Sequence, residues 1–135
     1  MKIRTAIKRD AGFLLKYDNH ISEKELYCVI SLGRILIAEE EEHPIGWLRW
    51  GMFWDNTPFI NMLYLLQNYR SRGYGKELVM FWEKRMKEKR YSIAMTSTLS
   101  TETAQYFYRK LKYTDVGSLI LKREPLEIIF MKELI

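Results

Sequence analysis

The sequence predicts an α+β fold built as one small domain over residues 1–135. Stretches of alternating or β-rich apolar residues are interspersed with stretches in which apolar residues recur every three or four positions, a pattern typical of strands and amphipathic helices. With 47% apolar residues in 135, the chain can bury one core. An apolar strand also runs directly into a glycine-containing basic loop and then a helix, which indicates an anion-binding site.

The first third of the chain predicts one strand followed by two helices. Residues 2–6 read as a short strand, and residues 8–18 have helical periodicity. Ser22 and Glu25 have the spacing of a capping box, so a second helix begins there and ends near Gly33.

Three strands follow in the middle of the chain. Residues 34–39 and 45–53 read as antiparallel partners, separated by the polar turn 40–44. A second turn at residues 55–58 leads into a strand over residues 60–66, which ends at the glycine loop.

The remainder predicts helix, strand, helix and two strands. Residues 75–87 are helical and residues 91–97 are rich in strand formers. The next helix is capped by the segment that begins at Ser100, and its apolar face carries Ala104, Phe107, Tyr108 and Leu111. Tyr108 is therefore expected to point inward. Residues 116–122 and 126–132 form the last two strands.

The glycine loop excludes two familiar phosphate-binding motifs. A Walker A loop requires Ser or Thr after Gly-Lys, whereas Gly75-Lys76 is followed by Glu77. A dinucleotide fingerprint requires a third glycine, whose place is taken by the bulky Leu78. The pattern that remains is Arg70-x-x-Gly73-x-Gly75.

The net charge of +5 is concentrated beside this loop. The segment from Arg70 to Arg90 contains eight basic and three acidic residues, and the rest of the chain is balanced. Such a local field suits a ligand with several phosphates, while a nucleic-acid reader more often spreads its charge along a groove. The cations from Lys84 to Arg90 also have a structural explanation, because they would offset the negative end of a helix dipole.

Two motifs and the order of elements resemble the GCN5-related N-acetyltransferase (GNAT) family. The first motif is Arg70-x-x-Gly73-x-Gly75, and the second is Ala104-x-x-x-Tyr108-Arg-Lys-Leu111-Lys-Tyr113. The resemblance covers essentially the whole chain. It implies a three-layer α/β/α arrangement around a central mixed, mostly antiparallel sheet in the order β-αα-βββ-α-β-α-ββ.

The same resemblance implies the cofactor site. Backbone groups of the strand before the loop, at Tyr64 and Leu65, would bind the pantetheine amides and face the thioester oxygen of acetyl-CoA. Thr101 stands where the family often has a cofactor-contacting asparagine. The diphosphate would be bound by the loop and first helical turn, which comprise Arg70, Ser71, Arg72, Gly73, Tyr74, Gly75 and Lys76.

Tyr108 is the expected general acid for the departing thiolate, since the ordinary pKa of a tyrosine, about 10, lies near that of a thiol. The general base is not identified. Asn61 and Met62 occupy the strand positions where family members often have a glutamate, which leaves Asp55, His20 or a water molecule.

The expected function is transfer of an acetyl group from acetyl-CoA to a primary amine, small molecule or peptide, through a direct ternary complex. Cys28 is expected to fill the core and not to carry the acyl group. The alternatives are a GNAT-like domain that senses acyl-CoA without turnover and, less favoured, a basic nucleic-acid-binding module. The aromatic residues Trp47, Trp50, Phe53, Trp54 and Phe59 suggest an acceptor wall or a homodimer contact.

We expect a cytoplasmic protein without a bound metal. His20, His43 and Cys28 are isolated from one another in the sequence, so no metal-ligand set is apparent. No apolar stretch approaches the roughly 18 residues of a membrane-spanning helix. The N-terminus also lacks the apolar region of a signal peptide.

Overall fold

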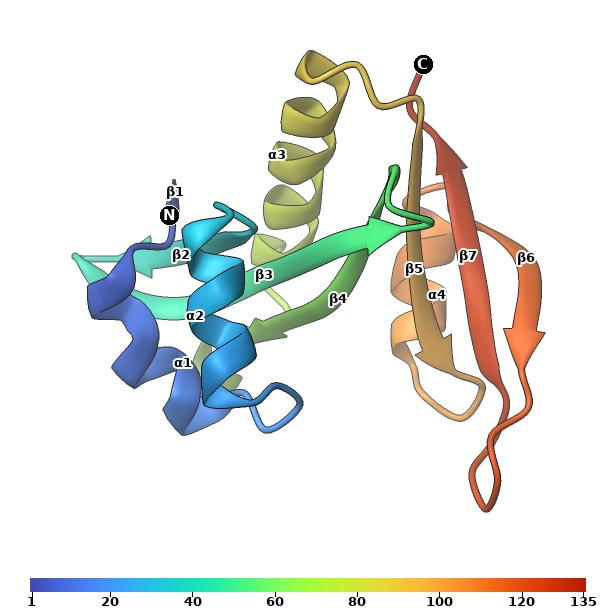
Figure 1. Ribbon diagram of the computed structural model, residues 1–135, viewed down its shortest axis with the longest axis horizontal. Coiled ribbons are helices and arrows are strands. Elements are labelled where there is room, and N and C mark those ends of the chain that lie inside the picture. The colour runs from blue at the N-terminus through green and yellow to red at the C-terminus, as the bar shows by residue number, and fades with distance from the viewer. The chain divides into compact units, whose positions relative to one another are not determined.

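The computed structural model describes residues 1–135 and has the predicted order of elements (Figure 1). Two short 3-10 helices, at Lys8–Asp10 and Gln67–Tyr69, accompany the regular elements. The α-helices are α1 (Ala11–Tyr17), α2 (Glu23–Ser31), α3 (Tyr74–Glu88) and α4 (Ala104–Lys110). The strands are β1 (Lys2–Thr5), β2 (Ile35–Glu40), β3 (His43–Phe53), β4 (Thr57–Leu65), β5 (Ile93–Leu99), β6 (Thr114–Leu119) and β7 (Glu127–Glu133).

The seven strands follow the order β1-β2-β3-β4-β5-β7-β6 in one sheet. β1 with β2, β2 with β3, β5 with β7 and β6 with β7 are antiparallel, and β4 with β5 is parallel. The predicted mixed, mostly antiparallel α+β sheet is therefore confirmed. Backbone contacts divide the chain into two compact units, one of residues 1–51 and 62–82, the other of residues 52–61 and 83–135. The single domain stays a prediction.

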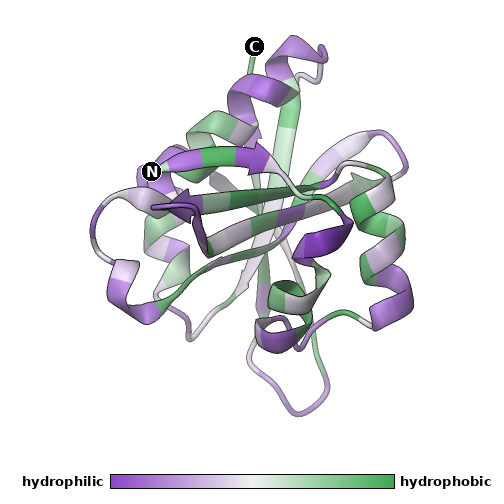
Figure 2. Cartoon of the chain, turned by 90° about the vertical axis from the view of Figure 1, so that its left-hand side faces the viewer, coloured by the Kyte–Doolittle hydropathy of each residue, from purple (hydrophilic) through white to green (hydrophobic).

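The core of the first unit lies between α1, α2 and the strands β2 and β3. Leu14, Leu26, Ile37 and Trp47 are fully buried in one cluster, and Figure 1 shows the two helices lying against these strands. The helices alternate between hydrophobic and hydrophilic residues, as an amphipathic face requires (Figure 2). At the start of α2, the Ser22 side chain accepts a hydrogen bond from the backbone of Glu25, which confirms the predicted cap.

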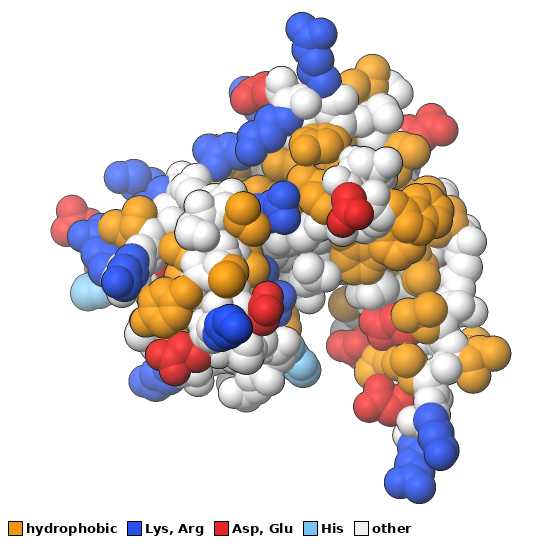
Figure 3. Space-filling view, in the orientation of Figure 1, with side chains coloured by type: hydrophobic (Ala, Val, Ile, Leu, Met, Phe, Trp, Pro, Cys, Tyr) orange, Lys and Arg blue, Asp and Glu red, His pale blue; other side chains and the backbone are white.

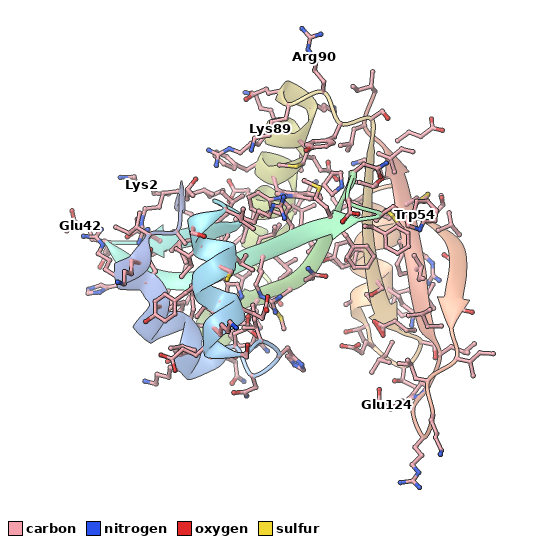
Figure 4. All side chains as sticks on the ribbon, viewed as in Figure 1. Lys2, Glu42, Trp54, Lys89, Arg90 and Glu124 are labelled. Atoms are coloured by element: carbon pink, nitrogen blue, oxygen red, sulfur yellow. The ribbon has the colours of Figure 1, made fainter.

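The aromatic residues of β3 divide between two environments. Trp47 belongs to the helix-covered cluster, whereas Trp50 packs edge-on against Trp82 of α3, with ring centroids 6.2 Å apart. Both indoles are core residues, so neither is free to form an acceptor wall. Trp54, in contrast, is 73% exposed at the turn before β4, as Figure 4 shows.

Hydrophobic side chains also gather on the surface of the second unit. In the space-filling view, which has the orientation of Figure 1, they lie over β5 and β7 (Figure 3). Trp54 and Asp55 both have left-handed backbone angles, with φ of 56° and 63°. A bulky residue rarely adopts such angles, so this turn is strained.

Cys28 is exposed on α2, and the expectation that it fills the core is wrong. The inward face of this helix is supplied by Leu26 and Val29. At helical spacing, residue 28 falls on the side that faces away from Leu26.

In the second unit, α4 packs on one face of β5 and β7 (Figure 1). Tyr108 and Phe130 are buried there, and Tyr108 points inward as predicted. Tyr113 is 1% exposed, and its hydroxyl donates to Glu83 Oε2 at 2.8 Å. Lys132 Nζ also donates to Glu83, at 2.9 Å to Oε1, so the buried carboxylate has two donors.

Substitution of Tyr113 by Phe tests this network. The change removes one donor from a buried carboxylate and keeps the ring, so we expect the free energy of unfolding to fall by about 1–3 kcal/mol. Tyr106, which is 58% exposed, supplies the matched control. Tyr106→Phe should change stability by no more than about 0.5 kcal/mol. Urea unfolding of both variants measures the difference, and equal stabilities would contradict the role of the Tyr113 hydroxyl.

Candidate functional site

The segment between β4 and α3 forms a short, left-handed entry into the helix. β4 ends at Leu65, and α3 begins at Tyr74, one residue earlier than predicted. Ser71 has φ of 62° and Gly73 has φ of 83°. A Cβ added to Gly73 would meet no atom within 4 Å, so this glycine is needed for its backbone angle and not for lack of space.

The first backbone N–H groups of α3 have no acceptor within the helix. The N–H of Glu77 donates to the Gly73 carbonyl at 3.1 Å, the first helical bond of this end. The N–H groups of Tyr74, Gly75 and Lys76 precede it and have no helical acceptor. Together with the positive end of the helix dipole, they form a site that favours a phosphate-like anion.

The basic residues of this region divide along the length of α3. Lys76 is exposed in the first turn, whereas Arg85 and Lys87 lie in the last turn. A helix of 15 residues is about 22 Å long, so the last-turn cations lie far from the glycine loop. Figure 4 shows Lys89 and Arg90 at that far end. We therefore favour the structural explanation for these cations, in which they offset the negative end of the helix dipole, over a role in binding the ligand.

Arg70 connects the loop to the end of β4. Its Nε donates to the Leu65 carbonyl at 2.8 Å, and its guanidinium lies over the Tyr64 ring, 5.1 Å from the centroid. Tyr64 in turn stacks on Trp47, with centroids 4.8 Å apart. The loop is thus linked to the core through a continuous stack of side chains.

No motif in the sequence points to Gly46 as part of this region. A Cβ on Gly46 of β3 would collide with the Tyr64 carbonyl oxygen and would lie 2.6 Å from Leu65 Cδ2 and 3.1 Å from Leu65 Cα. The backbone of β4 therefore approaches β3 closely at the two residues predicted to bind the pantetheine arm. A strand glycine can indicate such an approach, but the partner is known only from the fold.

A second interaction holds the first turn of α3. The Tyr74 hydroxyl forms a hydrogen bond with Glu40 at the end of β2, which lowers the pKa of Glu40, with help from the terminal ammonium of Met1 and from Arg72. The same bond raises the pKa of Tyr74. The Tyr74 side chain thus anchors the helix start and leaves its backbone N–H to a ligand.

The catalytic candidate Tyr108 lies in the second unit. It is 5% exposed, and burial raises its pKa well above the ordinary value, although a hydrogen bond with Thr96 opposes the shift. The hydroxyl therefore keeps its proton at neutral pH. The backbone ladder between β4 and β5 pairs Phe59 with Met95 and Ile60 with Thr96 and contains no further pair.

The remaining predicted residues lie at the surface. Thr101 is exposed in the turn before α4. The residue at the N-cap of α4 is Thr103, and no side chain caps the helix there. The prediction that the segment starting at Ser100 caps this helix is therefore wrong. His20 is exposed in the loop after α1, and Asp55 lies in the strained turn before β4.

Glu127 of β7 is a carboxylate that the sequence did not single out. Burial raises its pKa, a hydrogen bond from Ser97 Oγ at 3.1 Å opposes the shift, and Glu102 and Glu124 raise it further. Glu102 is distant in sequence from Glu124 and Glu127, and the pairing of β5 with β7 brings it near them. No sequence pattern predicts that meeting.

The structure thus brings the predicted residues together in two groups. The first unit contains Tyr64, Leu65 and the segment from Arg70 to Lys76, and the second contains Thr101 and Tyr108. No three His, Cys, Asp or Glu side chains form a group that could bind a metal ion. No helix has the length and apolar character needed to cross a membrane.

Comparison with known proteins gives one family and many similar structures. A model described as the acetyltransferase (GNAT) family matches residues 5–113. Among curated proteins, none matches this chain. The ribosomal-protein-alanine N-acetyltransferase of Brucella melitensis has a TM-score of 0.84 at 17% identity, over 98% of this chain and 99% of that one.

Two further structures are similar over nearly their full lengths. The yncA protein of Salmonella typhimurium, solved with its cofactor acetyl-CoA, has a TM-score of 0.81 at 15% identity, over 99% of this chain and 94% of that one. The ribosomal-protein-S18-alanine N-acetyltransferase of Escherichia coli has a TM-score of 0.83 at 10% identity, over 98% of this chain and 93% of that one. At these identities the likeness shows the fold alone.

Substitution of Gly46 by Ala tests the close approach of β3 to β4. The added methyl group must displace the backbone at Tyr64 and Leu65, so we expect a loss of about 1–3 kcal/mol in the free energy of unfolding and weaker binding of acetyl-CoA. Gly12→Ala is the matched control, because a Cβ there meets nothing within 4 Å and removal of a helical glycine stabilises by roughly 0.5–1 kcal/mol. Denaturant unfolding and calorimetry measure both effects. Unchanged cofactor binding by Gly46→Ala would contradict the constraint.

Proposed function

This chain belongs to the GNAT acetyltransferase family, and on that basis we propose that it transfers an acetyl group from acetyl-CoA to a primary amine through a direct ternary complex. The predicted class, an acetyl-CoA-dependent N-acetyltransferase, is confirmed at the level of the family. The acceptor and the roles of single residues belong to the proposal. The acceptor is a small molecule or a peptide that presents a primary amine.

The start of α3 is the observation that carries the proposal. Coenzyme A bears a diphosphate, and the N–H groups of Tyr74, Gly75 and Lys76, which have no acceptor within the helix, offer donors at the positive end of a helix dipole. The left-handed angles of Ser71 and Gly73 turn the chain into the helix beside these donors. The residues present therefore fit the diphosphate, and Lys76 adds a positive charge.

The end of β4 supports the binding of the pantetheine arm. Arg70 already donates a hydrogen bond to the Leu65 carbonyl. The other backbone groups of Tyr64 and Leu65 are therefore the ones that bind the pantetheine arm and the thioester oxygen in this proposal. A preorganised N–H donor at such an oxygen contributes roughly 2.7–4 kcal/mol to lowering the barrier in other acyl-transfer enzymes.

Acetyl-CoA supplies an acyl group activated as a thioester. The amine nitrogen of the acceptor forms a bond to the carbonyl carbon as the C–S bond breaks. Tyr108 gives its hydroxyl proton to the departing sulfur, and the proton that the nitrogen loses returns the tyrosine to its neutral form through solvent. Burial keeps Tyr108 protonated before reaction, but it also raises the pKa of the hydroxyl further above that of a thiol, which makes the proton harder to give. The exposed Cys28 takes no part in acyl transfer.

A pair of charge-removing variants on α3 tests the diphosphate site. Lys76→Gln should weaken acetyl-CoA binding about tenfold, equivalent to ~1.4 kcal/mol, because it removes a cation from the first turn. Lys87→Gln removes the same charge from the last turn and should leave affinity within about twofold. Calorimetric titration of both variants measures the difference. If both bind equally well, or if the wild type gives no heat, the proposed site fails.

Substitution of Tyr108 by Phe tests the general acid. The ring and its packing remain, so acetyl-CoA affinity should be kept, while kcat should fall by about 100-fold or more because proton transfer by a positioned group is lost. Tyr106→Phe, in the same helix, should behave like the wild type. Release of coenzyme A in the presence of an amine panel measures kcat. Unchanged turnover on the accepted amine would remove Tyr108 from the mechanism.

A further inference from the structure

The β5–β7 ladder has one face that the helices of its own unit leave uncovered. Arg109 of α4 lies over the Phe130 ring, 5.2 Å from its centroid, and Glu83 of α3 accepts from Lys132, so both helices lie against the face that carries residues 130 and 132. Side chains alternate between the faces of a sheet. The register therefore places on the opposite face, here named the open face, the pairs Ile93–Glu133, Met95–Met131, Ser97–Ile129 and Leu99–Glu127.

An aromatic cluster extends the open face. Phe59 of β4 pairs with Met95, and Phe53 stacks on Phe59 with ring centroids 6.0 Å apart. Phe53 also contacts Trp54 at 4.6 Å, and Trp54 is 73% exposed. Ile129 and Met131 are half-buried on the open face. A half-buried apolar face beside an exposed tryptophan is typical of a surface that binds a partner, because aromatic anchors carry much of the binding energy in such contacts.

The charges of the open face all have one sign. Glu127 accepts from Ser97 Oγ at 3.1 Å, and Glu102 Oε1 accepts from the N–H of Leu99, the residue paired with Glu127, at 3.0 Å. Two carboxylates thus meet at this end of the ladder, while Glu133 lies at the other end. No lysine or arginine belongs to the open face. In the space-filling view, acidic side chains accompany the hydrophobic ones over these strands (Figure 3).

We propose that the open face and Trp54 bind a basic peptide whose free amino group is the acetyl acceptor, an inference that rests on the proposed function. Arginine or lysine side chains of the peptide pair with Glu127 and Glu133, and its apolar side chains contact Ile129, Met131 and Trp54. The acceptor amine is then one part of a longer ligand, of which the rest provides affinity and selection.

The dimensions and the charges favour this occupant. The strand from Ile93 to Leu99 is about 20 Å long at roughly 3.3 Å per residue, which is the length of several peptide residues and exceeds that of a small amine. Burial raises the pKa of Glu127, and Glu102 and Glu124 raise it further, so a bound cation relieves repulsion among these carboxylates. A second copy of the chain, related by two-fold symmetry, would bring the same acidic face against itself.

The experiment compares two peptides of equal length with a free N-terminus and the same apolar residues. One peptide carries arginine at its remaining positions and the other carries glutamate. Because arginine has no primary amine, the N-terminus is the single acceptor in both. An amino-acid amide, which has the amine without the extension, is the third acceptor. We expect kcat/KM to be at least about tenfold higher for the arginine peptide than for the glutamate peptide.

Variants of the open face are matched with variants elsewhere. The double variant Glu127→Gln, Glu133→Gln should raise KM for the arginine peptide about tenfold, and Trp54→Ala should do the same. KM for acetyl-CoA and for the amino-acid amide should stay unchanged in both. The controls are Glu88→Gln, which removes an exposed charge from α3, and Tyr106→Ala, which removes an exposed ring from α4. Both controls should behave like the wild type.

A second readout requires no turnover. Calorimetric titration of the wild type with the arginine peptide should give binding that weakens as salt is added, and the double variant and Trp54→Ala should each bind about tenfold more weakly than Glu88→Gln and Tyr106→Ala. Thermal unfolding shows that each variant is folded. Sedimentation of the free protein reports whether a second copy covers the open face.

The outcomes separate this inference from the proposed function. If amines are acetylated but the variants match their controls, or if both peptides are used equally well, the inference is overturned and the acetyltransferase stands. A wild-type dimer that Trp54→Ala converts to a monomer also overturns it. If no amine is acetylated but the arginine peptide binds and the variants weaken its binding, the surface stands and the proposed function fails.

Discussion

The path of the backbone at the end of β4 is the constraint on which the candidate binding region depends. Gly46 allows β3 to approach Tyr64 and Leu65 closely, and Trp47 holds the Tyr64 ring by stacking. Arg70 then bonds back to Leu65 from the loop. Because the loop begins only a few residues later, the position of the strand end determines where the free N–H groups of α3 point.

The second unit places polar groups in its interior, where Glu83 is paired and the Thr98 hydroxyl has no hydrogen-bond partner. Glu83 receives hydrogen bonds from Tyr113 and Lys132, and the Thr96 hydroxyl donates to the Ile60 carbonyl. Buried polar groups of this kind contribute little net stability but are costly to leave unpaired. They fix side-chain directions more strictly than apolar packing would, which suits a region that must hold one hydroxyl in one orientation.

Sequence periodicity predicted the order of all elements, because each helix and strand carries its own apolar pattern. The glycine loop could also be located from the sequence, because its motif lies within one short segment. Other features depend on how distant segments pair, which no single stretch of sequence encodes. They are the contacts of Gly46 with β4, the hydrogen bond between Ser97 and Glu127, and the exposure of Cys28. The tryptophans illustrate the limit: Trp47 and Trp50 lie in a predicted strand, but no local pattern shows that both are covered.

The surface position of Cys28 affects any colorimetric assay of this enzyme. Aromatic disulfide reagents that report liberated coenzyme A also react with an accessible protein sulfhydryl, and each chain carries one such group. Every reaction mixture therefore contains a fixed background proportional to enzyme concentration. A Cys28→Ser protein removes this background at an exposed position, and the same sulfhydryl offers a single attachment point for a fluorophore.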